Sequence, residues 1–384
     1  MVNTCAFVEE ARQESIDAIL GLAEQKADRA KLVVTGCMAE RYGSELAAAL
    51  PEADAVVGFG VPVHLDLGTG GSRADVSAAQ TMDLLNLPRR ADVALPWAYV
   101  KVAEGCDRAC GFCAIPSFRG PQRSRTEAAV LAEVEALAGR GVREVVLVAQ
   151  DLAAYGRDRT GDVGGERRIV PLVRAVAERV DWVRLLYLYP SSLTDELVDT
   201  ICCTGIPYFD LSLQHVSQPL LRRMRRWGDG DRFRGRIEAI RQRAPEATFR
   251  SSFIVGYPGE TEDDHDQLMA FIDEARLDWV GFFAYSPEPG TYAAQLDGRV
   301  TPELVAERLA ELREQQDAIT AARRDDLVGS VVEVLVDHPG AARSHREGPE
   351  IDGIITVPPK IPVGDIAKVR IAGAAGPDLE AVVA

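Results

Sequence analysis

The stretch Glu104-Gly-Cys-Asp-Arg-Ala-Cys-Gly-Phe-Cys-Ala114 carries three of the chain's seven cysteines, Cys106, Cys110 and Cys113, in a C-x3-C-x2-C pattern. A cubane 4Fe-4S cluster normally takes four thiolates, and this loop supplies three. The other four cysteines are distant in the sequence. The spacing therefore predicts a cluster with one iron that is open to a small chelating molecule.

Two other interpretations of the triad are a zinc site and an electron-transfer cluster completed by a remote cysteine. Zinc sites usually combine C-x2-C pairs or add histidines. The nearest histidines, His64 and His215, lie far from the loop in the sequence. The spacing resembles that of the radical S-adenosylmethionine (SAM) superfamily, whose pattern has an aromatic residue at the position of Phe112. In that superfamily the methionine part of SAM occupies the open iron.

The composition points to a multidomain globular protein with an acidic surface. The chain has 384 residues, of which 47% are hydrophobic, and a formal net charge of -16. No apolar run is long enough to span a membrane, and the N-terminus does not resemble a signal peptide. Seven cysteines, with three in one loop, suit metal ligation in a reducing cytoplasm. Proteins that bind nucleic acid need a basic surface that neutralises phosphates, so the negative net charge of this chain favours a basic partner.

The first 62 residues are expected to form an α/β fragment, with strands at 2–5 and 31–35 and helices after each. Cys5 and Cys37 follow the two strands, at the sheet edge where ligands bind in open α/β folds. Residues 63–94 are rich in Gly and polar residues and are expected to form a linker.

Residues 95–325 alternate strands and helices, which predicts a parallel sheet with crossover helices. Six strands, two short of a full (β/α)8 barrel, are expected at 98–102, 142–148, 183–189, 208–213, 248–255 and 279–285. Polar loops follow the strands, so the candidate functional groups are expected to lie together at the carboxyl end of the barrel. Thr301 is expected to cap a long closing helix at 302–324. Residues 326–384 contain short β-rich runs and predict a small β-barrel.

Four segments together resemble the methylthiotransferase family, which has an N-terminal cysteine-bearing domain of flavodoxin-like α/β type, a radical SAM partial (β/α)6 barrel and a C-terminal TRAM barrel. They are Val2-Asn-Thr-Cys-Ala-Phe-Val-Glu-Glu-Ala, Thr35-Gly-Cys-Met-Ala-Glu-Arg-Tyr, Cys113-Ala-Ile-Pro-Ser-Phe-Arg-Gly and Phe253-Ile-Val-Gly-Tyr-Pro-Gly-Glu-Thr.

The family has one branch that modifies a tRNA adenosine and one, RimO-type, that modifies an aspartate of small-subunit ribosomal protein twelve. Ala149-Gln-Asp-Leu-Ala-Ala-Tyr-Gly and Arg343-Ser-His-Arg-Glu-Gly-Pro-Glu-Ile-Asp-Gly resemble the protein-modifying branch. Residues 327–384 hold eight acidic and five basic residues, which suits a basic protein better than tRNA. A non-catalytic iron-sulfur or RNA-binding module is the alternative of another class.

The resemblance implies a transferase with two 4Fe-4S clusters and an external electron donor, such as a reductase or a flavodoxin-like protein. SAM cleavage at the Cys106/Cys110/Cys113 cluster would allow hydrogen removal from the aspartate β-carbon. Sulfur would come from a second cluster on Cys5 and Cys37, and a further SAM would donate the methyl group. The family has a third N-terminal cluster cysteine that nothing here matches. We expect either that the native chain starts upstream or that this chain ligates the second cluster incompletely.

By position, the resemblance also suggests SAM contacts at the ends of the strands. Gln150 and Asp151 would accept from the SAM amine, and Gln214 would reach its ribose or carboxylate. Ile254 and Val255 would offer backbone groups to adenine.

Other residues invite functional hypotheses that have simpler structural interpretations. His215 suggests a proton relay, although a histidine that shapes the loop is favoured. Cys202 and Cys203, near the end of a helix expected to begin at Thr194 and stop at Gly205, are expected to be small structural residues. The basic run at 222–226 is expected to be a solvated helix face.

Overall fold

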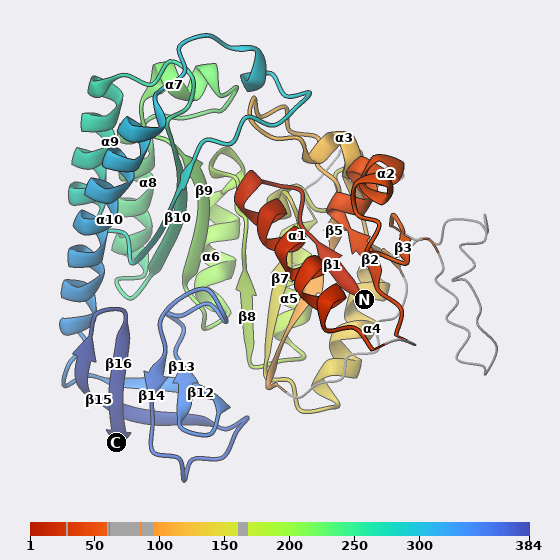
Figure 1. Cartoon of the computed structure of the whole chain (residues 1–384). Coiled ribbons are helices and arrows are strands. Elements are labelled where there is room, and N and C mark those ends of the chain that lie inside the picture. Colours follow the sequence, from red (N-terminus) through yellow and green to blue (C-terminus); the bar gives the residue numbers. More distant parts are fainter. Residues whose placement is uncertain (28–29, 60, 62–84, 87–94, 160–167) are drawn as a thin grey trace. The chain divides into compact units, whose positions relative to one another are not determined.

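The computed structural model describes residues 1–27, 30–59, 61, 85–86, 95–159 and 168–384 (Figure 1). The chain divides into two compact units, which are described separately. The first unit comprises Met1–Leu87, Phe112–Pro121 and Ser286–Ala294, and the second comprises Pro88–Gly111, Gln122–Tyr285 and Gln295–Ala384. The expected linker at 63–94 lies almost wholly outside the described residues.

The first unit contains a parallel sheet of β1 (Val2–Thr4), β2 (Val33–Gly36) and β3 (Ala55–Val56), in the order β1-β2-β3. Helices α1 (Glu9–Glu24) and α2 (Cys37–Ala49) follow the first two strands, as expected, whereas β3 was not anticipated. Buried Ile19, Val34 and Met38 belong to its hydrophobic core. The short helix α3 (Ile115–Arg119) also belongs to this unit.

A glycine makes the turn from β2 into α2 possible. Gly36 has φ +98°, and a Cβ atom there would collide with the backbone of Thr4 on the neighbouring strand. Because Thr4 pairs with Gly36, the next residues along the chain, Cys5 and Cys37, both follow the carboxyl ends of adjacent parallel strands.

The second unit contains six parallel strands in two sheets, β4-β7-β8 and β11-β10-β9. The strands are β4 (Trp97–Lys101), β7 (Glu144–Val148), β8 (Trp182–Leu185), β9 (Tyr208–Gln214), β10 (Thr248–Val255) and β11 (Trp279–Ala284). Among the described residues, one isolated parallel bridge, Leu188 to Leu211, links the two sheets, which together are called the arc below. All six expected strands are present, and the expected α/β class with a partial barrel is confirmed.

One expected strand is shorter than the sequence suggested. We expected a strand over 183–189, but β8 ends at Leu185. Tyr187 has φ +63°, a left-handed conformation that a β-strand does not contain. Its N–H donates instead to the Asp210 carboxylate at 2.9 Å. This turn explains why, in the part of the chain that the structure describes, the two sheets of the arc share no more than this one bridge.

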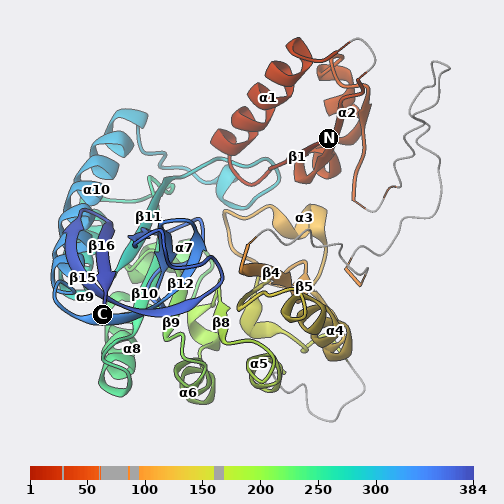
Figure 2. The same ribbon diagram turned by 90° about the horizontal axis from the view of Figure 1, so that it is seen from below.

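Helices cover the outer face of the arc, as Figures 1 and 2 show. Thr126, Thr194, Ser217, Asp229 and Thr261 each accept a backbone N–H as N-cap of a helix in this unit. These helices and their companions are α4 (Glu127–Ala138), α5 (Ile169–Ala177), α6 (Asp195–Cys203), α7 (Gln218–Arg223), α8 (Gly230–Arg243), α9 (Glu262–Ala275) and α10 (Pro302–Asp325). Thr301 caps α10 as expected.

The C-terminal residues form a closed five-stranded barrel in the order β12-β13-β14-β16-β15. Its strands are β12 (Val331–His338), β13 (Ala341–Arg343), β14 (Ile355–Thr356), β15 (Ile366–Ala375) and β16 (Asp378–Val383). Apolar side chains such as Val334, Val369 and Ile371 fill its core. The expected small barrel is confirmed, although β13 and β16 were not anticipated. In Figure 1 it lies below the amino ends of the parallel strands.

Short elements complete the part of the chain that the structure describes. Two short strands, β5 (Ala103–Glu104) and β6 (Arg123–Ser124), pair antiparallel. Three 3-10 turns are η1 (Leu152–Ala154), η2 (Pro190–Ser192) and η3 (Ala293–Gln295). In the described part of the chain, no helix combines the length and the apolar character that a membrane crossing needs.

Candidate active site

The cysteine loop leaves the sheet after β4 and is held at both ends. The pairing of β5 with β6 closes its base. Within the second unit, the Gln122 N–H donates to the Asp107 carboxylate at 3.0 Å, and the Gly111 N–H donates to the Met224 carbonyl at 2.8 Å. The part of the loop that carries Cys106 and Cys110 is therefore fixed against the α7 end of the arc.

Both cysteines of this part of the loop accept a hydrogen bond. The Arg108 N–H donates to Cys106 Sγ at 3.4 Å, and Arg226 Nη1 donates to Cys110 Sγ at 3.2 Å. Burial raises the pKa of the Cys106 thiol, and the Arg108 N–H only partly opposes this shift. Both thiols are half-buried, and neither forms a disulfide.

A buried carboxylate lies beside the loop at the end of β7. Asp151 is 3% exposed, and its Oδ2 accepts from Arg108 Nε at 2.6 Å. Arg108 Nη2 also donates to Ser192 Oγ at 2.9 Å. Asp151 Oδ1 and Gln150 Oε1 are buried and have no hydrogen-bond partner among the described residues. Buried acceptors of this kind are costly unless a ligand satisfies them.

The other residues that the sequence suggested for SAM follow neighbouring strands. Gln214 ends β9 with φ +71° and is half-buried. Ile254 and Val255 end β10. The Val255 carbonyl already accepts the Tyr285 N–H at 2.8 Å, so it offers one remaining lone pair. These residues share the carboxyl end of the arc with Gln150 and Asp151.

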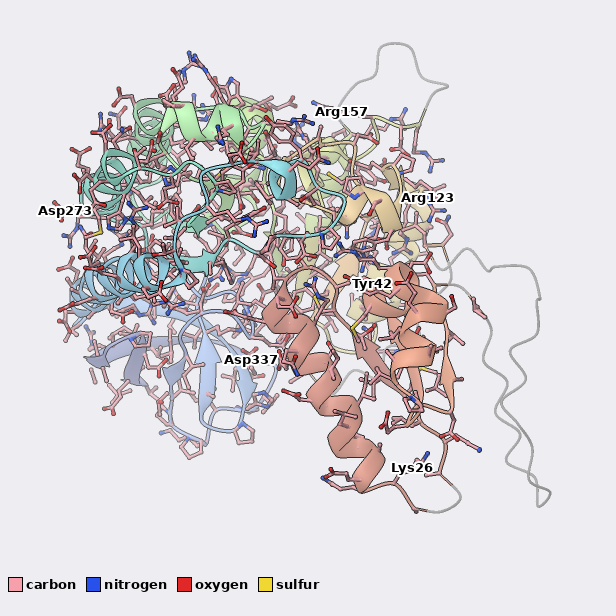
Figure 3. The ribbon with its side chains drawn as sticks, turned by 45° about the horizontal axis from the view of Figure 1, so that its top comes forward. Lys26, Tyr42, Arg123, Arg157, Asp273 and Asp337 are labelled. Atoms are coloured by element: carbon pink, nitrogen blue, oxygen red, sulfur yellow. The ribbon has the colours of Figure 1, made fainter. Side chains whose placement is uncertain are left out.

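The first unit has its own cysteine pair. The Phe7 N–H approaches Cys5 Sγ at 3.5 Å, and Arg119 Nη2 donates to Cys37 Sγ at 2.8 Å. Tyr42 lies on α2 (Figure 3). The Arg41 guanidinium lies over the Tyr42 ring and pairs with Glu288 at 2.6 Å. Phe112 and Cys113 also belong to this unit, and both are half-buried.

The residues present fit iron-sulfur ligation by their chemistry. Within the described part of the chain, no three His, Cys, Asp or Glu side chains surround a point where a metal ion would sit. The donor set nevertheless consists of half-buried thiols beside the cationic groups of Arg108, Arg226 and Arg119. Such cations favour the anionic thiolates that cluster irons require. For SAM, the unsatisfied Asp151 oxygen is an acceptor suited to an ammonium group.

Among the described residues, His215, Cys202 and Cys203 have structural surroundings rather than contacts with the cysteine loop. The Ser217 N–H donates to His215 Nδ1 at 3.1 Å, and burial lowers the pKa of His215 to about 4. This neutral, hydrogen-bonded ring agrees with a role in shaping the loop. Thr194 caps α6 and Gly205 has positive φ after it, as expected. Cys202 is half-buried, but Cys203 is exposed, so a buried structural role is wrong for Cys203.

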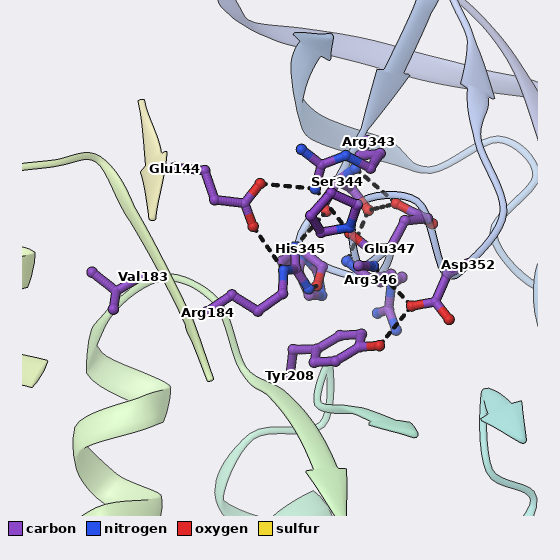
Figure 4. A network of polar contacts seen from close by, with 12 residues as sticks. Glu144, Val183, Arg184, Tyr208, Arg343, Ser344, His345, Arg346, Glu347 and Asp352 are labelled. Atoms are coloured by element: carbon purple, nitrogen blue, oxygen red, sulfur yellow. Dashed lines mark hydrogen bonds and ion pairs between the residues drawn. The ribbon is translucent and has the colours of Figure 1, made fainter. Parts of the chain in front are cut away.

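The opposite end of the arc carries a dense charge network that the sequence did not reveal (Figure 4). Glu144, fully buried at the start of β7, pairs with Arg184 at 2.7 Å and with Arg343 of the barrel at 2.8 Å. Burial alone would raise the pKa of Glu144, but the two guanidiniums outweigh burial and lower it.

The loop between β13 and β14 extends this network across the amino ends of the strands. Asp352 accepts from the Tyr208 hydroxyl at 2.6 Å (Figure 4). Asp352 also pairs with Arg250 at 2.5 Å. Trp279 Nε1 donates to the Arg346 carbonyl at 2.7 Å. The segment that resembled the protein-modifying branch therefore anchors the small barrel to the sheet.

Three family models match successive parts of the chain. The model of uncharacterized protein family UPF0004 matches residues 1–58, the radical SAM superfamily model matches residues 100–272, and the TRAM domain model matches residues 328–384. The order agrees with the three parts expected from the sequence.

Curated relatives match nearly the whole chain. The "ribosomal protein uS12 methylthiotransferase RimO" of Moorella thermoacetica is 44% identical over 97% of this chain and 87% of the relative. Proteins of the same name from Cutibacterium acnes and Kineococcus radiotolerans are 40% and 41% identical, each over 99% of this chain, and over 89% and 88% of the relative. The chain belongs to the RimO family. RimO membership confirms the radical SAM methylthiotransferase class expected from the sequence.

Sequence reasoning missed the arginines of the site. Arg108 lies between the first two cysteines, and Arg226 belongs to the basic run that was interpreted as a solvated face. Both guanidiniums lie over the ring of Tyr189, at 3.8 Å and 4.4 Å from its centroid. No local signal joins Arg226 to Cys110, because 116 residues separate them in the chain. For the RimO chain, the arrangement brings Cys106, Cys110, Gln150 and Asp151 to one end of the arc.

Proposed function

We propose that this chain attaches a methylthio group to the β-carbon of an aspartate in ribosomal protein uS12. The observation that carries the proposal is the cysteine loop at the carboxyl end of the parallel strands, next to a buried carboxylate with one unsatisfied oxygen. Membership of the RimO family supplies the reaction class and the substrate.

The cysteines divide between two cluster sites. Cys106, Cys110 and Cys113 would hold the cluster that binds SAM, and Cys5 and Cys37 would ligate the second cluster. When bound, the first cluster and SAM supply a one-electron route to a C–H bond that acid–base chemistry cannot break at neutral pH. The second cluster is the proposed source of sulfur.

Residues of the second unit would hold SAM in place. Asp151 Oδ1 would accept from the SAM ammonium, which would supply the partner that this buried oxygen lacks. Arg108 keeps Asp151 oriented through its 2.6 Å contact. Gln150 would accept from the same ammonium through its free Oε1.

Gln214, Ile254 and Val255 are proposed to hold the adenosine part of SAM. Gln214 would reach the ribose or carboxylate, and Phe112 would pack beside the first cluster. Ile254 and the remaining lone pair of the Val255 carbonyl would contact adenine.

The small barrel supports a protein substrate over tRNA. Several of its charged residues, including Asp337, Arg343 and Glu347, are buried in internal ion pairs. The acidic residues left at least partly exposed are Glu333, Glu350, Asp352, Asp365, Asp378 and Glu380, and the basic ones are Arg346, Lys360, Lys368 and Arg370. A tRNA-binding surface needs a basic excess, which this surface does not have.

The proposed organisation of the chain follows from these assignments. We assign residues 1–62 to the sulfur-donating domain, 63–94 to a linker, 95–325 to the radical SAM partial barrel and 326–384 to the TRAM barrel. We also propose that the chain works in the cytoplasm, takes uS12 free or within the small subunit, and receives electrons from a reductase or a flavodoxin-like protein.

Mass spectrometry of cells that lack the gene tests the proposal. We expect uS12 from these cells to lose the mass of one methylthio group on a single aspartate, and a plasmid copy of the chain's full gene to restore it. Methylthio-adenosines of tRNA should be unchanged. Loss of the tRNA modification with intact uS12 would instead assign the chain to the tRNA branch.

A further inference from the structure

Arg226 reaches the cysteine loop from a distant part of the second unit. It follows α7, and its Nη1 donates to Cys110 Sγ at 3.2 Å. Its Nη2 donates to the Ser212 carbonyl at the end of β9. The guanidinium lies 4.4 Å from the centroid of the Tyr189 ring. Three contacts from three elements therefore fix its plane, and a planar guanidinium held in this way loses little further freedom when it donates to sulfur.

Arg226 is half-buried, and the burial of its Nε has an energetic cost that its protein contacts do not remove. Its Nε is buried and has no hydrogen-bond partner among the described residues. A solvated face, which the basic run first suggested, would leave such a group in water. Arg222 on the same run is exposed and shows that expected behaviour. The position of Arg226 is therefore explained better by the sulfur it contacts than by the solubility of the helix.

We propose that Arg226 is a positioning residue that holds the Cys110 thiolate and raises the reduction potential of the cluster bound there. Hydrogen bonds to cluster sulfurs and local net charge are among the factors that set iron-sulfur potentials. A cationic donor at a ligating sulfur stabilises the reduced cluster, which carries one more negative charge. The inference rests on the proposed function only in taking Cys110 as a cluster ligand.

The test is a redox titration of the reconstituted chain, followed by electron paramagnetic resonance, with iron content measured on each sample. In Arg226→Gln we expect full iron and a tenfold shift of the reduction equilibrium toward the oxidised cluster, which corresponds to about 59 mV for one electron. Arg226→Lys, which keeps the charge but not the planar fork, should shift it less. Arg222→Gln is the matched control and should keep the wild-type potential.

A wild-type potential in iron-replete Arg226→Gln would overturn the proposal. If Arg226→Gln fails to keep iron, Arg226→Lys decides: a potential below that of the wild type supports the proposal, and an unchanged one overturns it. The proposed function fails separately, since it is tested by the methylthio group on uS12, which the redox titration does not measure.

Discussion

The two ends of the parallel strands in the second unit use polar groups in opposite ways. At the amino end, buried charges are paired: Glu144 of β7 contacts Arg184 of the neighbouring strand β8 and Arg343 of the small barrel. At the carboxyl end, Asp151 Oδ1 and Gln150 Oε1 are buried without a partner among the described residues. The paired charges at the amino end suit a permanent contact between sheet and barrel. The unsatisfied acceptors at the carboxyl end suit a ligand that binds reversibly.

This difference matches the general division of parallel α/β barrels, in which chemistry is found at the carboxyl ends and stability at the amino ends. It also changes the interpretation of the segment that begins at Arg343. In the sequence it served only to favour the protein-modifying branch, and in the structure Arg343 and Asp352 face the sheet. Substitutions at the two ends should therefore separate loss of activity from loss of stability.

The largest effect is expected at the carboxyl end. Replacing Cys106, Cys110 or Cys113 by Ser removes one of three thiolate ligands, so reductive SAM cleavage should fall to the background rate. Thermal unfolding should change little because these residues lie in a loop. Release of 5'-deoxyadenosine measures the effect, and Cys203→Ser, at an exposed position, is the control. A triad variant that still cleaves SAM would refute the assignment of that cysteine.

At the amino end, Glu144→Gln should reduce stability more than any surface change. It leaves the buried Arg184 without its carboxylate, which costs about 3–5 kcal/mol of unfolding free energy. Denaturant unfolding measures the loss. The neighbouring Arg143→Gln removes an exposed pair with Asp181 and should cost about 0–1 kcal/mol. Equal losses in the two variants would show that the network does not anchor the barrel.

Asp210, on β9 between the two ends, predicts a pH effect on stability. Burial raises its pKa from 3.8 to about 6. The folded state then binds a proton that the unfolded state has lost, so this carboxyl lowers the unfolding free energy as pH rises from about 4 to about 6. The decrease is at most about 3 kcal/mol. Asp210→Asn should remove this decrease. The unfolding free energy of the variant, measured against that of the wild type, should therefore be higher at neutral pH than at pH 4.

Asp195→Asn provides a control of opposite sign. Arg236 lowers the pKa of Asp195, so its stabilisation is present at neutral pH and is lost as pH falls through the folded-state pKa. Urea unfolding across this pH range compares the two variants. If the Asp210→Asn curve runs parallel to that of the wild type, Asp210 does not titrate as described.

The smallest effect is expected for SAM affinity. Asp151→Asn removes the charge proposed to hold the SAM ammonium, and the KM for SAM should rise roughly 10- to 100-fold with little change in iron content. Asp181→Asn, which removes a carboxylate that pairs with an arginine at the amino end, should leave the KM unchanged. An unaltered KM in Asp151→Asn would remove this residue from the SAM site.

Much of the fold could be predicted because its signals are local. The six parallel strands and α10 with its Thr301 cap follow from hydrophobic patterning and capping residues. The strands β3, β13 and β16 were missed, because β3 and β13 have only two or three residues and β16 ends the chain after a turn. The early end of β8 depends on the backbone of Tyr187, which no composition rule forecasts.

The candidate site was predictable only where residues are close in sequence. The cysteine spacing and the position of Asp151 after a strand could be recognised directly. The contacts of Arg226 with Cys110 and of Glu144 with Arg343 join residues that are distant in the sequence. Such pairs depend on tertiary packing, so the same arginines could equally have been solvated.

The most direct test of the account is reductive SAM cleavage by the reconstituted wild-type chain, Cys110→Ser and Glu144→Gln, measured side by side as 5'-deoxyadenosine released per chain. The temperature is set below the unfolding transition of Glu144→Gln. We predict release by the wild type and by folded Glu144→Gln, and none above background by Cys110→Ser. Release by Cys110→Ser, or its loss in folded Glu144→Gln, would contradict the separation of chemistry and stability between the two ends.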